Sequence, residues 1–231
     1  MNFNLNVAKA LLGAAVVVGA TTAISQPASA LSFSFTQNQT TSNLGGVTTV
    51  GFTSGVGSLP AGYTENGITY TGGGIIANGA SLANQYAAPP GVTTNYLSLG
   101  GDGQPSPVTI ALGSLKRYFG LYVGSIDSYN SFTFFNGSDQ VGSSLNGNQL
   151  AALVGLPANG NQGINGAGYA EFSDNIGFDK IVLASSRAAL ESDNHAFSTN
   201  VPTPALLPGL IGMGVAALRK RKNEAAEQAD A

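Results

Sequence analysis

The stretch "RYFGLYVGS", from Arg117 to Ser125, decides the fold class. Apolar side chains recur at every second position of this stretch, which is the period of a β-strand and not of a helix. One face of the strand then carries Phe119, Leu121 and Val123, and the other face carries Tyr118 and Tyr122. Aromatic side chains suit strand positions generally. The stretch therefore predicts a β-strand with apolar side chains on both of its faces.

The same alternation recurs in short bursts along residues 31–200. These are "LSFSFT" (31–36), "VTIAL" (108–112), "SFTFF" (131–135), "DQVGSS" (139–144), "GYAEFS" (168–173), "DKIVLAS" (179–185) and "HAFS" (195–198). Asn136-Gly137-Ser138 predicts a type I′ hairpin turn, because Asn and Gly tolerate positive φ. One short helix is expected at "GNQLAALVG" (147–155). Short strands separated by turn residues predict an all-β fold, a jelly-roll-like β-sandwich.

The composition narrows the class of protein. Gly accounts for 32 of 231 residues and charged residues for only 9%, whereas ordinary soluble domains contain about 25% charged residues. Cys is absent, which excludes disulfides and thiolate chemistry. Nine acidic and four basic residues lie between Leu31 and Val201, a net charge of 4 − 9 = −5. Nucleic acid is therefore not expected as a partner, because no basic patch is present to bind phosphates.

The N-terminal residues have the anatomy of a secretory signal peptide. Lys9 precedes the apolar run "ALLGAAVVVGATTAI" (10–24), and Pro27 precedes the small residues Ala28, Ser29 and Ala30. We expect cleavage after Ala30, with Ala28 and Ala30 as the residues that the signal peptidase reads. An uncleaved N-terminal anchor is the alternative.

The C-terminal residues combine an apolar run with a basic cluster. Residues 205–218 contain no charge, and a helix of this length reaches about 21 Å against a bilayer core of about 30 Å. This predicts a short, marginal transmembrane helix that suits temporary retention. A basic cluster follows this helix and would act as a membrane stop. The positive-inside rule keeps this cluster on the cytoplasmic side. The cluster consists of Arg219, Lys220, Arg221 and Lys222.

The segment "VPTPALLPGLIGMGVAALRKRK" (201–222) resembles the PTPA-type C-terminal sorting signals, a cyanobacterial variant of the PEP-CTERM class. The residues that match the motif are Val201, Pro202, Thr203, Pro204 and Ala205. The resemblance implies an exosortase-dependent surface protein, whose sorting signal is recognised by an exosortase-type membrane protease. Two departures are Thr203 in place of Glu and the extra tail "NEAAEQADA" (223–231).

The central blocks "YFGLYVGSIDSYNSFTFFNG" (118–137) and "FDKIVLASSRAALESDNHAF" (178–197) are similar to secreted PEP-CTERM-type surface proteins. This likeness implies a jelly-roll-like sandwich exported to the cell surface or extracellular matrix, and it carries over no catalytic residue. The expected organisation is a signal peptide (1–30), a β-sandwich extracellular domain (31–198), a linker with the sorting motif (199–204), a short transmembrane helix (205–218), and a basic cluster with a cytoplasmic tail (219–231).

Two groups of residues are candidate binding sites. Aromatic rings beside carboxylate and amide groups suit a glycan, which points to Tyr122, Asp127, Tyr129 and Asn130. Tyr63, Tyr70, Tyr86 and Tyr96 add further aromatic candidates, although all these tyrosines could instead pack as half-buried strand residues. Calcium prefers carboxylate and amide oxygens, which points to Glu191, Asp193 and Asn194 as ligands.

Enzyme chemistry has little support in the sequence. His195 is the only histidine, so neither a Ser-His nucleophile pair nor a zinc site is expected. Paired carboxylates for glycoside hydrolysis stay an open alternative. We expect no cofactor apart from calcium, and no catalytic residue. The expected function is an exported, non-enzymatic surface or matrix protein that associates with exopolysaccharide. Alternatives are a glycan-specific lectin-like module and an uncleaved, membrane-anchored bitopic protein.

Overall fold

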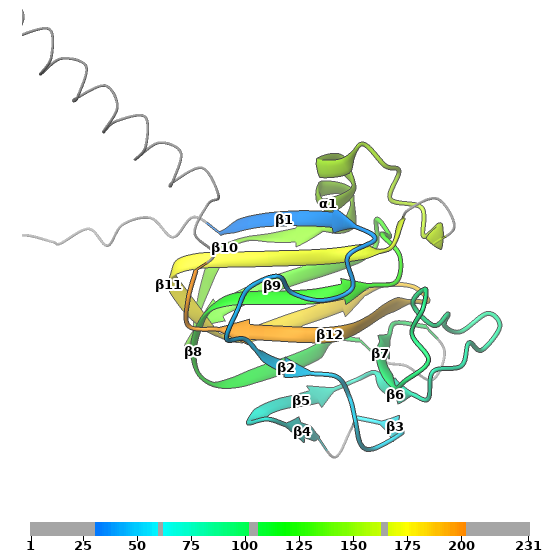
Figure 1. Ribbon diagram of the computed structural model, residues 1–231, viewed down its shortest axis with the longest axis horizontal. Helices are drawn as coiled ribbons and strands as arrows, with labels where there is room; N and C mark the ends of the chain where they lie inside the picture. The colour runs from blue at the N-terminus through cyan, green and yellow to red at the C-terminus, as the bar shows by residue number, and fades with distance from the viewer. Residues whose placement is uncertain (1–30, 60–61, 102–105, 163–165, 202–231) are drawn as a thin grey trace, which may run out of the picture.

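The computed structural model describes residues 31–59, 62–101, 106–162 and 166–201 (Figure 1). The strands in this part of the chain are β1 (Ser32–Gln37), β2 (Thr48–Val50), β3 (Gly57–Ser58), β4 (Tyr63–Glu65), β5 (Ile68–Gly72), β6 (Ile75–Ala77), β7 (Tyr96–Leu99), β8 (Val108–Val123), β9 (Asn130–Asn136), β10 (Asp139–Asn146), β11 (Gly168–Ser185) and β12 (Leu190–Ser198). One helix, α1 (Gly147–Val154), follows β10. The predicted signal peptide (1–30) and the predicted sorting segment from residue 202 onward lie outside the described residues.

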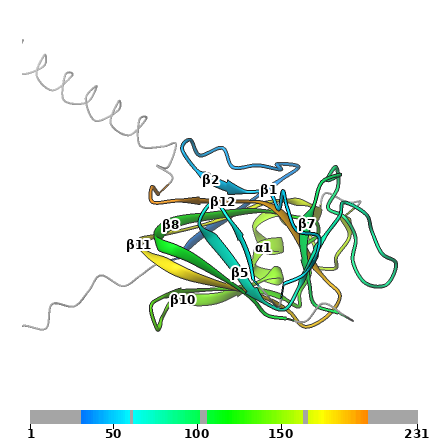
Figure 2. The ribbon, with the colours of Figure 1, turned by 90° about the horizontal axis from the view of Figure 1, so that it is seen from below.

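The strands form an antiparallel β-sandwich. Two long strands, β8 and β11, each contribute to both of its layers. In the first layer, residues 108–112 of β8 lie between β5 and residues 180–183 of β11, which also pair with β9. In the second layer, residues 118–123 of β8 lie between β12 and residues 168–173 of β11, which also pair with β1. Figure 2 shows β12 and β10 on opposite sides of the molecule, in different layers. The expected all-β sandwich is confirmed.

The sequence pattern splits β8 and β11 into four separate strands, and this expectation is wrong. Each strand continues from one layer into the other through a glycine with positive φ, Gly113 at +66° and Gly177 at +98°. In β11 the Asp174 carboxylate stabilises the bend, because its Oδ1 accepts hydrogen bonds from the backbone N–H groups of Ile176 (2.7 Å) and Gly177 (2.8 Å). Each of these strands therefore passes from one layer to the other without ending, at a position where the alternation pattern alone predicts the end of a strand.

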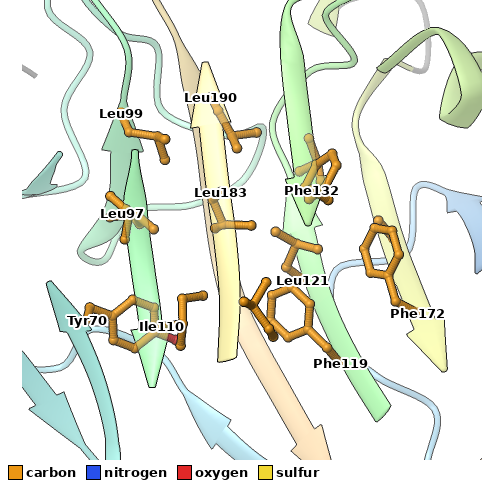
Figure 3. Close-up of a cluster of buried hydrophobic side chains, with 14 of the residues drawn as sticks. Tyr70, Leu97, Leu99, Ile110, Phe119, Leu121, Phe132, Phe172, Leu183 and Leu190 are labelled. Atoms are coloured by element: carbon orange, nitrogen blue, oxygen red, sulfur yellow. The ribbon is translucent and has the colours of Figure 1, made fainter. Parts of the chain in front are cut away.

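The core lies between the two layers and is rich in aromatic rings. Phe119 lies 5.2 Å from Phe197 and 6.0 Å from Phe172, measured between ring centroids. Figure 3 shows Leu121 and Phe132 gathered in the same interior. Burial of each such side chain stabilises the fold by about 1.5–3 kcal/mol. The predicted inward face of "RYFGLYVGS" is confirmed, since Phe119, Leu121 and Val123 all belong to this core.

A second apolar cluster covers the outer face of the second layer. It consists of the buried residues Tyr118, Tyr122, Ala167, Tyr169 and Ala196, against which Leu44, Val47 and Val92 pack. Gly120 makes this packing possible. A Cβ atom at Gly120 would lie 2.5 Å from Cε1 of Tyr169 and 2.6 Å from the hydroxyl of Tyr118. The aromatic–Gly pattern of the sequence thus reflects two tyrosine side chains that occupy the space above Gly120.

The local predictions for the hairpin and the helix are confirmed, with one change of turn type. β9 and β10 pair as a hairpin whose turn residues are Gly137 and Ser138. Gly137 has φ of +60°, whereas Ser138 is not among the residues with positive φ. This pattern is typical of a type II′ turn and not of the expected type I′ turn. α1 begins at a capping box between Asn146 and Gln149 and ends at Gly155 in the left-handed conformation.

None of the helices in the described part of the chain is long and apolar enough to cross a membrane. The predicted transmembrane helix at 205–218 lies outside that part.

Candidate functional site

A cavity of about 430 Å³ lies at the end of the sandwich where β8 and β11 end and β9 and β12 begin. Four segments line it. They are residues 81–87 from the connection between β6 and β7, residues 125–129 after β8, residues 159–162 after α1, and residues 188–191 at the start of β12. The connection between β6 and β7 projects from the body of the sandwich (Figure 1). Segments far apart in the sequence therefore meet around one space.

Asp127 is fixed in this cavity by its immediate neighbours. Its side chain is only 4% exposed, and its Oδ2 accepts a hydrogen bond from Ser125 Oγ (2.9 Å). Gly160 lies against the carboxylate so closely that a Cβ atom there would be 2.3 Å from Oδ1. The amide of Gly160 donates to the carbonyl of Ile126 (2.9 Å), which ties the 159–162 segment to the 125–129 segment. The carboxylate is thus held in one orientation against the cavity wall.

Glu191 is the second carboxylate that lines the cavity. It is 4% exposed, and its Oε1 accepts a hydrogen bond from the backbone N–H of Ala87 (2.7 Å). The pKa of Glu191 is raised from its ordinary value of 4.5 to about 7. Burial is the main cause, the hydrogen bond from the Ala87 N–H opposes the rise, and the negative charge of Asp127 adds to it. The cavity therefore holds two carboxyl groups, one of which binds a proton near neutral pH.

Two half-buried tyrosine rings also line the cavity. The hydroxyl of Tyr129 donates to the carbonyl of Ala188 (2.9 Å). Burial and the nearby Asp127 carboxylate raise the pKa of Tyr129. Tyr86 packs edge-on against Tyr96, with 6.3 Å between the ring centroids. Because their other neighbours fix both rings, each can present apolar surface to a ligand without reorganisation.

Amide and hydroxyl groups complete the lining. The side chains that can both donate and accept hydrogen bonds are Ser81, Asn84, Gln85, Ser125, Asn159 and Gln162. Arg187 is the cation beside this end of the sandwich, and its guanidinium carbon lies 5.9 Å from the centroid of the Tyr129 ring. The cavity thus combines rigid apolar surface with many hydrogen-bonding groups and two acids.

Only half of the residues predicted to bind a glycan line this cavity. Asp127 and Tyr129 do so. Tyr122 is 2% exposed on the outer face of the second layer, where its hydroxyl donates to the carbonyl of Pro90 (2.8 Å). Asn130 is 2% exposed, and both polar atoms of its side chain are without a hydrogen-bond partner. The structure therefore brings Asp127 and Tyr129 together and leaves Tyr122 and Asn130 outside the cavity lining.

The predicted calcium ligands lie on β12 and interact with different neighbours. Glu191 belongs to the cavity, as described above. Asp193 accepts from the backbone N–H of Asn194 (2.7 Å), and burial raises its pKa to about 6. The Asn194 amide donates to the carbonyl of Thr40 (3.0 Å). Within the described residues, no group of three or more His, Asp or Glu side chains is placed to hold a metal ion.

His195 is a core residue. It is fully buried, and its ring nitrogens are hydrogen-bonded to the hydroxyls of Tyr70 and Ser192, each at 2.9 Å. Burial lowers the pKa of His195 to about 3. A neutral, enclosed imidazole with both nitrogens hydrogen-bonded has a structural role.

The sequence indicates Tyr86 only as a general aromatic candidate and predicts Glu191 as a calcium ligand, whereas the structure places both in the cavity lining. The signal available for Tyr86 was the segment "NQYAAPP" (84–90), in which amides flank an aromatic ring before two prolines. Nothing local indicates that this segment lies against Asp127 and Glu191. That contact depends on long-range pairing, in which β6 pairs with β7 and β7 pairs with β12.

No family model matches the chain, and no curated protein matches it. Among solved structures, the chain is similar to a mutant of the carbohydrate-binding module CBM29-2, whose description concerns ligand recognition by family 29 carbohydrate-binding modules. The two share 10% sequence identity with a TM-score of 0.26, over 76% of this chain and 99% of that chain.

Proposed function

We propose that the protein is exported and that its β-sandwich binds a glycan in the cavity at the end of the sandwich. The observation that carries this proposal is the combination of Tyr86 and Tyr129 with the carboxylates of Asp127 and Glu191 in one space. A sugar presents C–H groups to the faces of aromatic rings, whose π-systems are negative. It also presents hydroxyls to carboxylate and amide groups. The cavity supplies both kinds of partner.

The size of the cavity fits this function. About 430 Å³ lies within the range of roughly 300–1,000 Å³ that small-molecule sites occupy. The lining residues come from segments that hydrogen bonds tie together, such as Ala87 to Glu191 and Gly160 to Ile126. A preformed site loses little conformational freedom when a ligand binds. The proposal is therefore a lectin-like module with a defined site, within the broader expectation of association with exopolysaccharide.

A glycan array probed with the full chain tests this proposal. We expect discrete binding that Tyr129→Ala and Tyr86→Ala each weaken by about tenfold, the effect of about 1.4 kcal/mol. Phe135→Ala is the matched control, because Phe135 is a half-buried ring on β9, under Lys180 and outside the cavity lining. Absence of any glycan binding, or equal losses in all three variants, would contradict the proposal.

The termini supply the rest of the proposal. Residues 1–30 would direct export, and an exosortase-type membrane protease would cut near Val201 to Ala205 after temporary retention by 205–218. We also propose that the strands are connected as in a jelly roll, which the resemblance to secreted PEP-CTERM-type surface proteins implies. The alternative is that the C-terminal helix stays uncleaved as a bitopic anchor. The native product would then be heavier than the processed one.

Calcium is proposed as an accessory ion at Glu191, Asp193 and Asn194. Bound calcium would neutralise two buried carboxylates and would raise the melting temperature of the protein. The melting temperature in millimolar calcium, compared with that in chelator, measures this effect. An unchanged melting temperature would remove calcium from the proposal.

Glycoside hydrolysis is the second candidate function. It is favoured by one observation, that two carboxyl groups line the same cavity and that the pKa of Glu191 is raised to about 7. A general acid needs such a raised pKa beside an ionised partner. Turnover of released polysaccharide that is lost in both Asp127→Asn and Glu191→Gln would establish this candidate over binding without turnover.

A further inference from the structure

Among the described residues, no cation forms an ion pair with either acid of the cavity. Asp127 and Glu191 are each 4% exposed. The hydrogen-bond partners that hold them, Ser125 and Ala87, are neutral. Neither carboxylate makes an ion pair with a described residue, and Arg187 lies over the ring of Tyr129 instead. Buried carboxylates without a paired cation are unusual, because the loss of hydration is not offset.

This arrangement is unfavourable for the empty cavity and favourable for a cationic ligand. The repulsion between the carboxylates helps to keep a proton on Glu191 near neutral pH. A positive group between Asp127 and Glu191 would replace that proton and would interact with both acids at low effective dielectric. Tyr129 adds to the attraction, since a cation is drawn to the negative face of an aromatic ring. Two acids and two tyrosines are a suitable environment for an ammonium group.

We propose that the glycan bound in this cavity is an amino sugar with a free ammonium group, as in a de-N-acetylated polysaccharide. This inference rests on the proposed function, because it names the ligand of the same site. A uronic acid would place a third carboxylate beside Asp127 and Glu191. A neutral or N-acetylated sugar would leave both acids without a counter-charge. The ammonium form is the sugar chemistry that neutralises the site.

The proposed ligand makes binding dependent on pH. The groups that face Glu191 are Asp127, the Ala87 N–H, Tyr96 and Tyr129, and Arg187 stands behind Tyr129. Only the ionised form of Glu191 pairs with an ammonium group. Affinity should therefore rise as the pH increases toward 7 and fall again at higher pH, where the amine of the sugar loses its proton. Below the pKa of Glu191, affinity should fall by up to about tenfold per pH unit.

The test is titration calorimetry of the full chain with four oligosaccharides of matched length. They are a glucosamine oligomer, its N-acetylated counterpart, a neutral glucan and an oligouronate. At pH 7 we expect the glucosamine oligomer to bind at least tenfold more tightly than the N-acetylated one. Glu191→Gln should weaken this preference, because Gln can still accept from Ala87 but carries no charge, which leaves Asp127 alone to pair with the ammonium group. Asp139→Asn is the matched control, since it removes an exposed carboxylate on the β9–β10 hairpin.

The outcomes separate this inference from the proposed function. Equal or tighter binding of the neutral or N-acetylated oligomer would overturn the inference and leave the glycan site in place. Absence of binding by all four sugars would overturn both. Calcium binding at these carboxylates without any amino-sugar binding would also overturn the inference. If Glu191→Gln does not fold, salt dependence replaces it, because affinity for the glucosamine oligomer alone should decrease with added salt.

Discussion

Two glycines mark positions where the absence of a side chain is required by a neighbour. Gly120 leaves room for the side chains of Tyr118 and Tyr169 on the outer face. Gly160 leaves room for Oδ1 of Asp127 in the cavity, and it also has φ of +72°. The first contact stabilises the sandwich, whereas the second positions a group of the proposed binding site. The two requirements can be separated by substitution.

Gly160→Ala should impair binding more than folding. The new Cβ would lie 2.3 Å from Asp127 Oδ1, so the carboxylate must move. Gly155→Ala is the matched control, because Gly155 has φ of +67° but no atom within 4 Å of its Cβ position. Both variants should lose about 1–2 kcal/mol of unfolding free energy for the left-handed conformation, and only Gly160→Ala should lose glycan affinity. Denaturant unfolding and binding assays measure the two effects, and equal affinities would contradict the assignment of Asp127 to the site.

The raised pKa of Glu191 predicts how stability depends on pH. The folded protein keeps this proton up to about pH 7, whereas the unfolded chain releases it near 4.5. The raised pKa thus favours the folded state below about pH 4.5 relative to high pH, and this advantage is lost as pH rises to 7. Glu191→Gln should therefore gain stability over the wild type across this range, by on the order of 3 kcal/mol at pH 8. Urea unfolding at pH 4.5 and 8 measures the change.

His195 acts in the opposite direction over part of the same range. Its pKa is about 3 in the folded protein against an ordinary value of 6.5, so the unfolded chain binds a proton that the folded protein excludes. Stability from this group is lost as pH falls below about 6.5. The wild type and Glu191→Gln both contain His195, so the difference between their free energies of unfolding reports on Glu191 alone. A difference that does not change between pH 4.5 and 8 would contradict the raised pKa.

At the scale of elements, β8 and β11 join the two layers of the sandwich. The bend in β11 depends on Asp174, which is 2% exposed and accepts two backbone N–H groups. Without that acceptor, the amides of Ile176 and Gly177 would lose their partner where the chain leaves one layer for the other. The carboxylate therefore substitutes for a ladder partner at the bend.

Asp174→Ala should lower the free energy of unfolding by about 2 kcal/mol, since hydrogen bonds to a charged group contribute about 1.5–3 kcal/mol each before relaxation. Asp174→Asn should lose less than half as much, because its amide oxygen can still accept from both N–H groups. Urea unfolding of the two variants measures this order. A loss in Asp174→Asn as large as that in Asp174→Ala would show that the two amides do not need the oxygen.

The elements with local signals were predictable from the sequence. β1, the β9–β10 hairpin and α1 each have alternation, a turn glycine or a capping residue within a few positions. The continuity of β8 was not predictable, because Gly113 looks like the end of a strand unless its partners in both layers are known. The hairpin type was also missed, since the two turn residues are Gly137 and Ser138 and not Asn136 and Gly137.

At the scale of the molecule, the candidate site depends on four segments that are distant in sequence. Asp127 and Tyr129 were predicted because an aromatic ring lies beside carboxylate and amide groups in that stretch of the sequence. Tyr86 and Glu191 come within reach of them only when β6 and β7 pair beside β12. A pattern over ten residues contains no information about that pairing. The sequence thus singled out Asp127 and Tyr129, which line the cavity, and the fold determined which other residues meet them.

Export and processing predict the mass of the native product. Removal of 1–30 and of the sorting segment should leave a protein that begins at Leu31 and ends between Val201 and Ala205. Intact-mass spectrometry of the protein recovered from the cell surface or medium measures both ends at once. A product that retains residues 206–231 would support the bitopic alternative.

The most direct test of the account is a crystal structure of the protein with the tightest glycan from the array. We predict the sugar between Tyr86 and Tyr129, within hydrogen-bond distance of Asp127 and Glu191, and with any amino group placed between the two carboxylates. A sugar bound on another face of the sandwich, with this cavity empty, would contradict the central claim.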